Sequence, residues 1–370
     1  MLILVTGSAG FVGKHLMESL GRRPGVQAVG VDIGSKPEDL ETALAQADAI
    51  FHLAGTNRPQ NVEEFTTGNA DFTAHICERL QQLGRHPLIV FSSSIQAALD
   101  NPYGVSKRQA EDAISRYAEE AKAPAAIFRL RNVFGKWCRP NYNSVTATFC
   151  HNIAHDLPIS ISDPDRELEL VYIDDVVAGF LAALDQPPAV GTCERREILK
   201  FHKITLGGLA EKIRSFRESR KTLLLPDFSD ELTKRLYATY LSYLDGSDFG
   251  YLLDKKTDPR GCLAEFVKSP AAGQIFVSRT KPGITRGNHY HHTKTEKFMV
   301  VEGSAIIRFR HINSQEVIEY PVEGHEFKVV DIPPGYTHSI ENVGTAEMVV
   351  LFWASEIFNP ENTDTYFVQV

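Results

Sequence analysis

The sequence has few cysteines and no long run of apolar residues. Its five cysteines are scattered among 370 residues without a Cys-x-x-Cys pair, so neither a disulfide framework nor a thiolate metal site is indicated. No apolar run approaches the roughly 20 residues that a membrane-spanning helix needs, and the opening segment Met1–Val5 is too short for a secretory signal. We therefore expect a cytoplasmic protein with reduced thiols and no membrane partner.

Positive charge is also scarce. The chain has 39 Lys and Arg residues against 47 Asp and Glu residues, a formal net charge of −8, which argues against a nucleic-acid partner. Its 43% hydrophobic and 23% charged residues exclude a disordered or low-complexity chain. The length is sufficient for two domains.

The first part of the chain alternates short apolar runs with longer amphipathic segments. The runs are apolar on both faces, which is typical of a parallel sheet covered by helices. The strand-like runs are Leu2–Thr6, Ala28–Val31, Ala49–Leu53, Leu88–Phe91 and Ala126–Leu130. The helical segments between them include Gly10–Leu20, Asn69–Leu83 and Tyr103–Ala121. This pattern predicts a doubly wound, Rossmann-like α/β domain over residues 1–245.

After residue 245 the apolar pattern changes to period two with frequent turn residues. Short strands at such intervals indicate an all-β sandwich or barrel, predicted over residues 246–370. The expected strands include Gln274–Ser278, Lys297–Val301, Ala305–Arg310, Glu316–Tyr320, Phe327–Ile332 and Met348–Trp353.

A nucleotide site is predicted where the first strand ends. Gly7, Gly10 and Gly13 have the spacing Gly-x-x-Gly-x-x-Gly, and missing side chains let a pyrophosphate approach the N–H groups of a helix N-terminus. A glycine-rich turn without a ligand would have the same spacing. Asp32, about 20 residues further on, can bind ribose hydroxyls and disfavours a 2′-phosphate, which favours NADH over NADPH. Lys36, the next cation, could still reach a phosphate.

Tyr103 and Lys107 are four residues apart and therefore lie on one face of a predicted helix. The ammonium and an oxidised nicotinamide would both lower the phenol's pKa, so that Tyr103 could exchange a proton with a substrate oxygen during hydride transfer. Ser92, Ser93 and Ser94 end a strand, where one hydroxyl could polarise the same carbonyl. Alternatively, Tyr103 and Lys107 could be only an exposed pair of side chains, four residues apart on the helix surface.

Together these motifs resemble the extended short-chain dehydrogenase/reductase family, whose members largely act on nucleotide sugars. The resemblance includes His52-Leu53-Ala54-Gly55, Arg131-Asn132-Val133-Phe134-Gly135 and Val171-Tyr172-Ile173-Asp174-Asp175. It implies that Ser94, Tyr103 and Lys107 are catalytic, and that Asn132 and Arg166 face the sugar nucleotide. It also implies that the dinucleotide is bound by Gly7, Gly10, Phe11, Val12, Gly13, Asp32, Leu53, Ala54 and Asn69.

The second domain has a candidate metal site. His289 and His291 alternate along a strand, so their imidazoles share one face, while Glu296 and His338 supply a carboxylate and a third imidazole. These ligands suit Zn²⁺, and Ni²⁺, Mn²⁺ or Fe²⁺ remain open. The spacings resemble the two motifs of a cupin barrel, except that Phe327 stands where the second motif begins with glycine.

A reductase domain fused to a cupin resembles the bifunctional capsule and O-antigen enzymes of UDP-N-acetyl-L-fucosamine biosynthesis, the CapF/WbjC type. The resemblance implies that the cupin epimerises C3 of a UDP-2-acetamido-2,6-dideoxy-4-ketohexose and that the reductase then reduces C4 with NADPH. The product would be a UDP-N-acetyl-6-deoxy-L-talosamine-type sugar on the route to UDP-L-FucNAc. A homodimer is also implied.

Two alternatives stay open at this point. The cupin could be a binding or dimerisation module on a nucleotide-sugar reductase of single activity, because a barrel fold does not fix function. The first domain could also sense a dinucleotide without turnover, although its Ser, Tyr and Lys set argues against this. Tyr290, His292, Lys297 and His311 are all candidates for the base that acts at C3.

Overall fold

The computed structural model describes residues 1–370, which divide into two compact units. The first comprises Met1–Arg214 and Glu231–Leu244, and the second comprises Ser215–Asp230 and Asp245–Val370. The sequence pattern gave no sign that 215–230 would group with the second unit. No helix is both long and apolar enough to cross a membrane.

The first unit is built on a six-stranded sheet in which every neighbouring pair is parallel. Its order is β2-β1-β3-β4-β5-β8, so the winding direction reverses between β1 and β3. The strands are β1 (Leu2–Thr6), β2 (Gln27–Val31), β3 (Ala49–His52), β4 (Leu88–Ser94), β5 (Ala125–Leu130) and β8 (Cys193–Arg196). Ligands of such doubly wound sheets bind beyond the carboxyl ends of the strands at this reversal.

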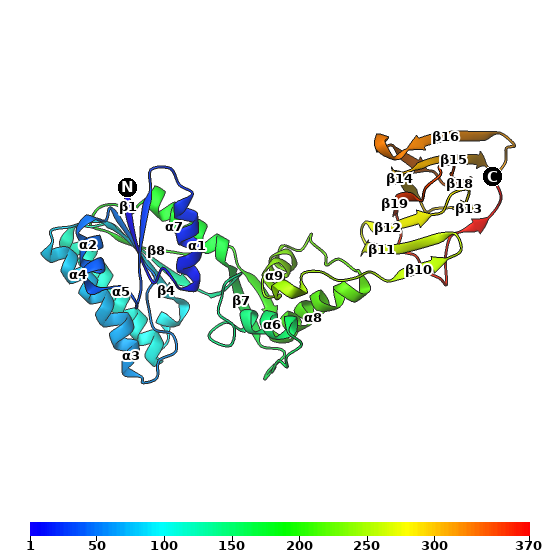
Figure 1. Ribbon diagram of the computed structural model, residues 1–370. Coiled ribbons are helices and arrows are strands. Elements are labelled where there is room, and N and C mark those ends of the chain that lie inside the picture. The colour runs from blue at the N-terminus through cyan, green and yellow to red at the C-terminus, as the bar shows by residue number, and fades with distance from the viewer. The chain divides into compact units, whose positions relative to one another are not determined.

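Helices cover both faces of this sheet (Figure 1). One face carries α1 (Phe11–Gly21) and α7 (Ile173–Asp185), which contact each other, and the opposite face carries α2 (Pro37–Gln46), α4 (Phe72–Gln82) and α5 (Pro102–Ala121). Two apolar cores fill the layers, one including Leu16, Phe51 and Phe180, the other Leu44 and Ile114. The Rossmann-like fold predicted from the alternating pattern is confirmed.

One predicted helix differs in its first turns. The sequence indicates a single helix over Asn69–Leu83, but the chain forms α3 (Glu63–Phe65), then a π-helical segment η1 (Thr66–Asp71), and only then α4. Insertions of π-helix cost hydrogen-bond geometry and occur frequently at functional sites. Here the insertion carries Asn69, a predicted cofactor ligand.

The remaining elements of the first unit form a smaller layer. A three-stranded sheet has the order β6-β7-β9. Its strands are β6 (Asn132–Phe134), β7 (Glu167–Tyr172) and β9 (His202–Thr205). The helices are α6 (Val145–Ala154), α9 (Glu231–Leu241) and α8 (Leu206–Thr222), of which α8 runs into the part of the chain grouped with the second unit.

Apart from residues 215–230, the second unit is an all-β barrel of the cupin type, made of two antiparallel sheets, as predicted (Figure 1). One sheet has the order β10-β11-β12-β19-β14-β17 and the other β16-β15-β18-β13-β20. The strands of the first are β10 (Lys255–Asp258), β11 (Gly261–Ser269), β12 (Gly273–Thr280), β14 (Glu296–Glu302), β17 (Val329–Ile332) and β19 (Met348–Ala354). Those of the second are β13 (Thr285–Tyr290), β15 (Ser304–His311), β16 (Val317–Glu323), β18 (Tyr336–Asn342) and β20 (Tyr366–Phe367).

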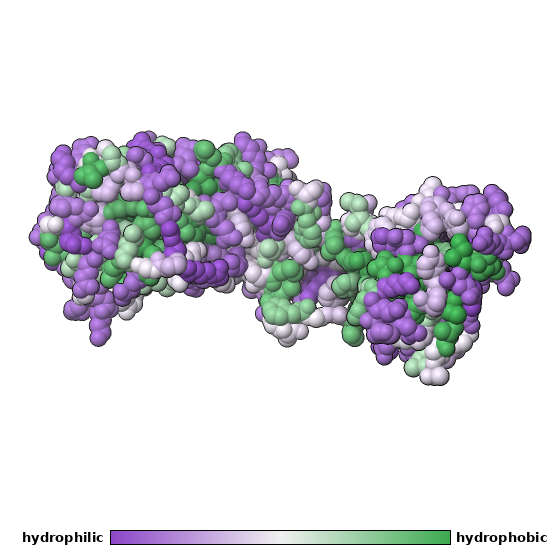
Figure 2. Space-filling view, turned by 90° about the horizontal axis from the view of Figure 1, so that it is seen from above, coloured by the Kyte–Doolittle hydropathy of each residue, from purple (hydrophilic) through white to green (hydrophobic).

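The barrel core is formed by the inward-facing residues of these strands, including Phe298, Ile307, Ile340 and Phe352. The predicted strand from Phe327 begins two residues later, at Val329, because Phe327 has a left-handed backbone (φ 49°) that ends a short 3₁₀ turn. The surface of each unit mixes hydrophilic and hydrophobic residues (Figure 2), as in most folded domains.

Candidate functional sites

The glycine loop lies at the reversal of the sheet. Gly7 has φ 70°, and a Cβ added there would lie 2.7 Å from the backbone nitrogen of Ala54, which follows β3. A Cβ on Gly13 would lie 2.2 Å from the carbonyl oxygen of Gly7. The loop therefore needs glycine at both positions, because α1 and the segment after β3 approach its backbone directly.

The N-terminus of α1 is open to an anion. Its cap residue, Gly10, has no side chain to cap the helix, and the first turn contains no acidic residue. Phe11 and Val12 begin the helix and pack against the apolar core with their side chains, which orients their backbone. Free N–H groups and the helix dipole at this end favour a phosphate.

Asp32 stands where a ribose-binding carboxylate is expected, just after β2. One of its oxygens accepts a hydrogen bond from the backbone N–H of Ala9 in the glycine loop at 2.7 Å, and the other accepts from Ile33 at 2.9 Å. The negative charge is thus fixed beside the loop. This is unfavourable for a 2′-phosphate nearby.

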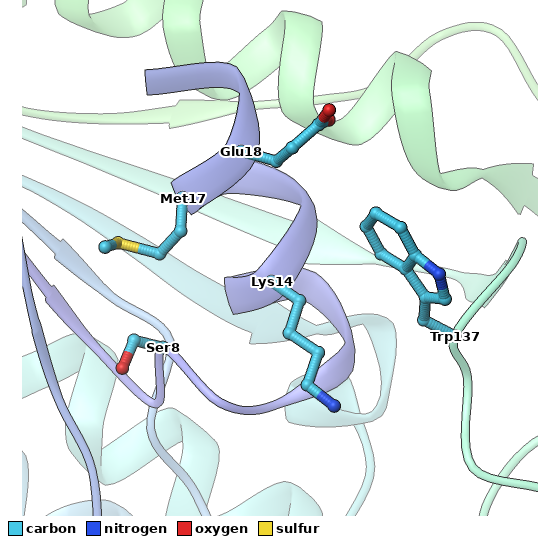
Figure 3. Close-up of a pocket in the computed structure, with 5 residues that line it drawn as sticks. All are labelled: Ser8, Lys14, Met17, Glu18 and Trp137. Carbon is cyan, nitrogen blue, oxygen red and sulfur yellow. The ribbon is translucent and has the colours of Figure 1, made fainter. Parts of the chain in front are cut away.

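A hollow of about 550 Å³ borders the loop along α1. Figure 3 shows Trp137 facing Lys14 across it, with Ser8 on the side of the glycine loop. Tyr103 and Lys107 do not line this hollow, so it is separate from the proposed proton-transfer groups.

Asn69 connects its own segment, η1, with the segment that follows β3 and with α5. Its side-chain amide donates to the Thr56 carbonyl at 3.1 Å and to the Ser106 hydroxyl at 3.0 Å, while its oxygen accepts from the Thr56 N–H at 3.0 Å. A Cβ on Gly55 would lie 2.6 Å from the Asn69 oxygen and 3.7 Å from Lys107 Nζ. The amide and the ammonium therefore converge on the backbone that follows β3.

The histidine that ends β3 is a structural group. His52 is buried between the Thr6 and Thr73 hydroxyls, at 2.7 and 2.9 Å, and the Thr73 hydroxyl donates to the Asn69 carbonyl. Burial, and to a lesser extent Lys107, lowers the pKa of His52 to about 3. This neutral histidine links β1 to the helix after β3 and supports Asn69.

The Ser, Tyr and Lys set is brought to one edge of the sheet. Asn101 caps α5 by accepting from the Gly104 N–H at 2.8 Å, which places Tyr103 in the first turn and Lys107 one turn later. Lys107 is 5% exposed and donates to the carbonyl oxygen of Ser92 at 2.7 Å, at the carboxyl end of β4. Ser94, two residues further along, interacts with the Tyr103 hydroxyl.

Burial dominates the electrostatics of this set. It raises the pKa of the Tyr103 phenol, an effect that Ser94 partly offsets, whereas the sequence led us to expect a lowered pKa. It also lowers the pKa of Lys107 to about 8. Tyr103 therefore keeps its proton at neutral pH and can donate it, which suits the reduction of a ketone.

A buried carboxylate behind Lys107 was missed by sequence reasoning. Glu111, one turn beyond Lys107 on α5, is 1% exposed and accepts from the Ser93 hydroxyl and, through both oxygens, from Arg129 on β5. Its charge raises the pKa of Lys107, against the larger effect of burial. Its position four residues after Lys107 was the signal that could have found it.

The two residues predicted to face the sugar nucleotide, Asn132 and Arg166, differ in their distance from the Ser, Tyr and Lys set. Asn132 begins β6, two residues after Leu130, which pairs with Ser94, so Asn132 is near the same sheet edge. Arg166 is exposed in the turn before β7, and no contact joins it to the other site residues. The structure thus brings Asn132, but not Arg166, toward Ser94, Tyr103 and Lys107.

The four predicted metal ligands cluster inside the barrel. One ligand atom each from His289, His291, Glu296 and His338 lies within 4.8 Å of all the others. Glu296 Oε2 is 3.2 Å from His291 Nε2 and 3.4 Å from His338 Nε2. Burial lowers the pKa of His289 to about 4, so its imidazole is neutral at neutral pH.

This cluster fits a bound divalent ion. The Nε2 atoms of His291 and His338 are buried without a hydrogen-bond partner of acceptable geometry, although both face the same carboxylate. Burial alone would raise the pKa of Glu296, but His291 and His338 hold it well below its ordinary value. Three imidazoles and one carboxylate match the donor set of zinc.

The four candidate bases differ in the face of the barrel on which their side chains lie. Tyr290 lies between His289 and His291 in the sequence, so its side chain points to the opposite face, where it stacks on Tyr366. His292 packs against both Tyr290 and Tyr366. Lys297 is exposed next to inward-facing Glu296 and forms an ion pair with Asp331 on β17.

His311 differs from the other three. It pairs with Tyr336, two positions along from the pair Phe309–His338, so its side chain shares a face with His338, a predicted metal ligand. Its Nδ1 accepts the backbone N–H of Asn313 at 3.2 Å, so in the neutral ring the proton is on Nε2. Nε2, the nitrogen that remains available to a ligand, can therefore donate a hydrogen bond but cannot accept a proton.

Comparisons with known proteins agree with this arrangement. Residues 3–196 match the NAD dependent epimerase/dehydratase family, and residues 256–366 match the polysaccharide biosynthesis C-terminal domain. The chain is 45% identical over 370 residues, covering 100% of it and 99% of the relative, to the UDP-2-acetamido-2,6-beta-L-arabino-hexul-4-ose reductase of Pseudomonas aeruginosa.

Solved structures extend the likeness to the whole fold. The capsular polysaccharide assembling protein CapF from Staphylococcus aureus superimposes with a TM-score of 0.92 at 47% identity, with both chains covered completely. UDP-glucuronic acid 4-epimerase from Bacillus cereus, at 20% identity and a TM-score of 0.57, shares the fold over 66% of this chain and 99% of its own. The chain belongs to the NAD dependent epimerase/dehydratase family and, within it, to the CapF/WbjC type, in which a polysaccharide biosynthesis C-terminal domain follows.

Proposed function

We propose that this protein converts a UDP-linked 2-acetamido-2,6-dideoxy-4-ketohexose in two steps, epimerisation at C3 in the barrel and reduction of C4 in the first unit. The observation that carries the proposal is the occurrence, in one chain, of Tyr103 and Lys107 beside a nucleotide loop and of a four-ligand cluster in a barrel. The relative from Pseudomonas aeruginosa is a reductase of a UDP-hexul-4-ose, which supports the substrate class.

Reduction needs a hydride for carbon and a proton for oxygen. The glycine loop would hold a nicotinamide cofactor, which would supply the hydride to C4 when bound. Tyr103, whose raised pKa keeps the phenol protonated, donates its proton to the ketone oxygen, and Ser94 donates a hydrogen bond to that oxygen. Lys107 holds the cofactor ribose and provides positive charge as the phenolate forms.

The dinucleotide is held by the groups around the sheet reversal. The glycine loop and the first turn of α1 bind the pyrophosphate, the segment after β3 lies against the loop, and Asn69 braces that segment. Asp32 favours a free 2′-hydroxyl, whereas the family resemblance implies NADPH. We therefore propose that both NADH and NADPH are accepted.

Epimerisation needs acidification of the C3 hydrogen. The ketone at C4 makes this possible, because transfer of the C3 proton to a basic side chain of the barrel gives an enolate, and return of a proton to the opposite face of C3 completes the epimerisation. A divalent ion, for which Zn²⁺ is the best fit, would be held by His289, His291, Glu296 and His338 and would polarise the substrate or stabilise the barrel. His311, with its proton on Nε2, donates a hydrogen bond to the developing enolate oxygen.

The test is to incubate the purified protein with the UDP-4-ketosugar in D₂O, with NADH, with NADPH or without either, and to follow both carbons by NMR. We expect deuterium at C3 without cofactor and a reduced C4 only with one. Reduction without any C3 exchange would instead favour the alternative in which the barrel is a binding or dimerisation module.

A further inference from the structure

The last residues of the chain pair with β13, the strand that carries His289 and leads into His291. Residues 363–370, here named the C-terminal strap, include β20, whose Tyr366 and Phe367 pair with Tyr290 and His289 of β13. Beyond β20, the Val368 N–H donates to the Asn288 carbonyl at 2.9 Å. The strap thus adds an outer strand next to the ligand-bearing strand.

Asp364, near the start of the strap, contacts the metal ligand His291 directly. Its backbone carbonyl oxygen lies 2.5 Å from His291 Nδ1, while His291 Nε2 faces Glu296 on the other side of the ring. A carbonyl oxygen only accepts, so Nδ1 carries the proton. Nε2 is then unprotonated and available as a ligand.

The carboxylate of Asp364 holds the carbonyl in place. One oxygen accepts the N–H of His292 at 3.0 Å, and the other accepts the N–H groups of Thr293 and Lys294, both at 2.9 Å, and the Thr293 hydroxyl at 3.0 Å. Four donors therefore converge on one side chain, immediately after the ligand. Asp364 has φ 42°, so its backbone is in the left-handed region that Gly and Asn tolerate best.

We propose that Asp364 is a positioning residue for the metal site: its carbonyl fixes the tautomer and orientation of His291, and its carboxylate locks the turn after this ligand. This inference rests on the metal site of the proposed function. It assigns the end of the chain a role in metal affinity, which no motif of the sequence indicated.

Two substitutions distinguish the effect of losing the Asp364 carboxylate from the effect of straining the backbone at this position. Asp364→Gly removes the carboxylate without backbone strain, because glycine accepts the left-handed region. Asp364→Asn keeps an acceptor oxygen and also tolerates that region. Asp331→Asn is a matched control, because Asp331 is an exposed carboxylate of the same unit that pairs with Lys297.

The measurement is the zinc affinity of the full-length protein in competition with a chromophoric chelator. Asp364→Gly keeps the carbonyl but frees the turn and the carbonyl from the carboxylate that holds them. Because outer partners of metal-ligating histidines are typically worth about 10- to 100-fold in metal affinity, we expect a loss of up to this size in Asp364→Gly, a smaller one in Asp364→Asn and none in Asp331→Asn. The d–d spectrum of bound Co²⁺ should change in Asp364→Gly only. A wild-type protein that binds zinc and an Asp364→Gly variant that binds it equally well would overturn the inference but leave the proposed function standing.

A second measurement does not depend on the folding of a variant. Long-range ¹H–¹⁵N NMR of the zinc-loaded wild-type protein should show His291 protonated at Nδ1 and metallated at Nε2. The opposite tautomer would overturn the role of Asp364 while leaving a metal site in place. If the wild-type protein binds no divalent ion, both this inference and the metal site of the proposed function fail.

Discussion

Lys107 and Glu111 lie one turn apart on the buried face of α5, and the carboxylate of Glu111 opposes the desolvation of the Lys107 ammonium. Burial still prevails and lowers the pKa of Lys107 to about 8. If the reductase requires the ammonium, kcat/KM for ketone reduction should fall as the pH rises through about 8. This is because deprotonation removes the positive charge beside Tyr103.

The role of Glu111 can be tested by the same pH profile. Glu111→Gln removes the charge that raises the pKa of Lys107, so the alkaline limb should move to lower pH. Glu111→Asp keeps the charge and should leave the limb nearly in place. Thermal melts check that both variants fold, because Glu111 also binds Arg129. An unshifted limb in a folded Glu111→Gln variant would show that Lys107 is not the group that titrates.

The two proposed activities should separate in Tyr103→Phe. Removing the phenolic proton donor should lower C4 reduction about 10²- to 10⁴-fold, the usual contribution of general acid catalysis. Deuterium incorporation at C3 should persist at the wild-type rate, because we propose that it takes place in the other unit. NMR follows both in one sample. Loss of both activities in a folded variant would contradict the division of labour.

The glycine loop offers a steric test of cofactor binding. In Gly13→Ala the new methyl would lie 2.2 Å from the Gly7 carbonyl oxygen, so the loop must shift away from the pyrophosphate. We expect NAD(P)H binding, measured by fluorescence titration, to weaken at least about tenfold, and stability to fall by about 1–3 kcal/mol. Gly21→Ala, on the same helix with nothing within 4 Å of the new Cβ, should leave binding unchanged.

The sequence predicted the parts of the molecule that depend on local pattern. Alternating apolar runs predicted the parallel sheet, and His289 and His291 on alternate positions predicted two ligands on one face, which Glu296 and His338 join. Asp364 could not be found in this way, because its role depends on a chain end meeting a strand more than 70 residues earlier.

The effect of burial on a pKa also cannot be predicted from a sequence pattern. A Tyr and a Lys four residues apart suggest that the ammonium lowers the pKa of the phenol, but the structure turns Lys107 toward the Ser92 carbonyl and burial raises the pKa of Tyr103. The identities of the groups were readable from the chain. The sign of the pKa shift depended on the packing around them.

Removing the proposed divalent ion should affect the two proposed activities unequally. Treatment with a chelator, followed by dialysis, should abolish C3 exchange if the ion polarises the substrate, and zinc should restore it. Reduction of a sugar already epimerised at C3 should be unaffected, because the cluster of potential metal ligands lies in the second unit. Exchange that survives in metal-free protein, verified by elemental analysis, would limit the ion to a structural role.

Among the four side chains considered for the reaction at C3, His311 shares a face with His338, and its neutral ring carries the proton on Nε2. Because Asn313 donates to Nδ1, the Nε2–H can donate to the enolate oxygen, and loss of one such donor typically costs about 10²- to 10³-fold in rate. His311→Ala should therefore slow C3 exchange by that factor, while His311→Gln, whose amide can donate, should retain part of it. C4 reduction of the epimerised sugar should be unchanged in both variants.

His325→Ala is the control for this prediction, because His325 is exposed in the turn η4 (Gly324–Glu326). It should exchange deuterium at C3 as fast as the wild-type protein. If His311→Ala also exchanges at the wild-type rate, the enolate must be stabilised by another group. In that case His311, although it shares a face with His338, serves only to pack against Tyr336.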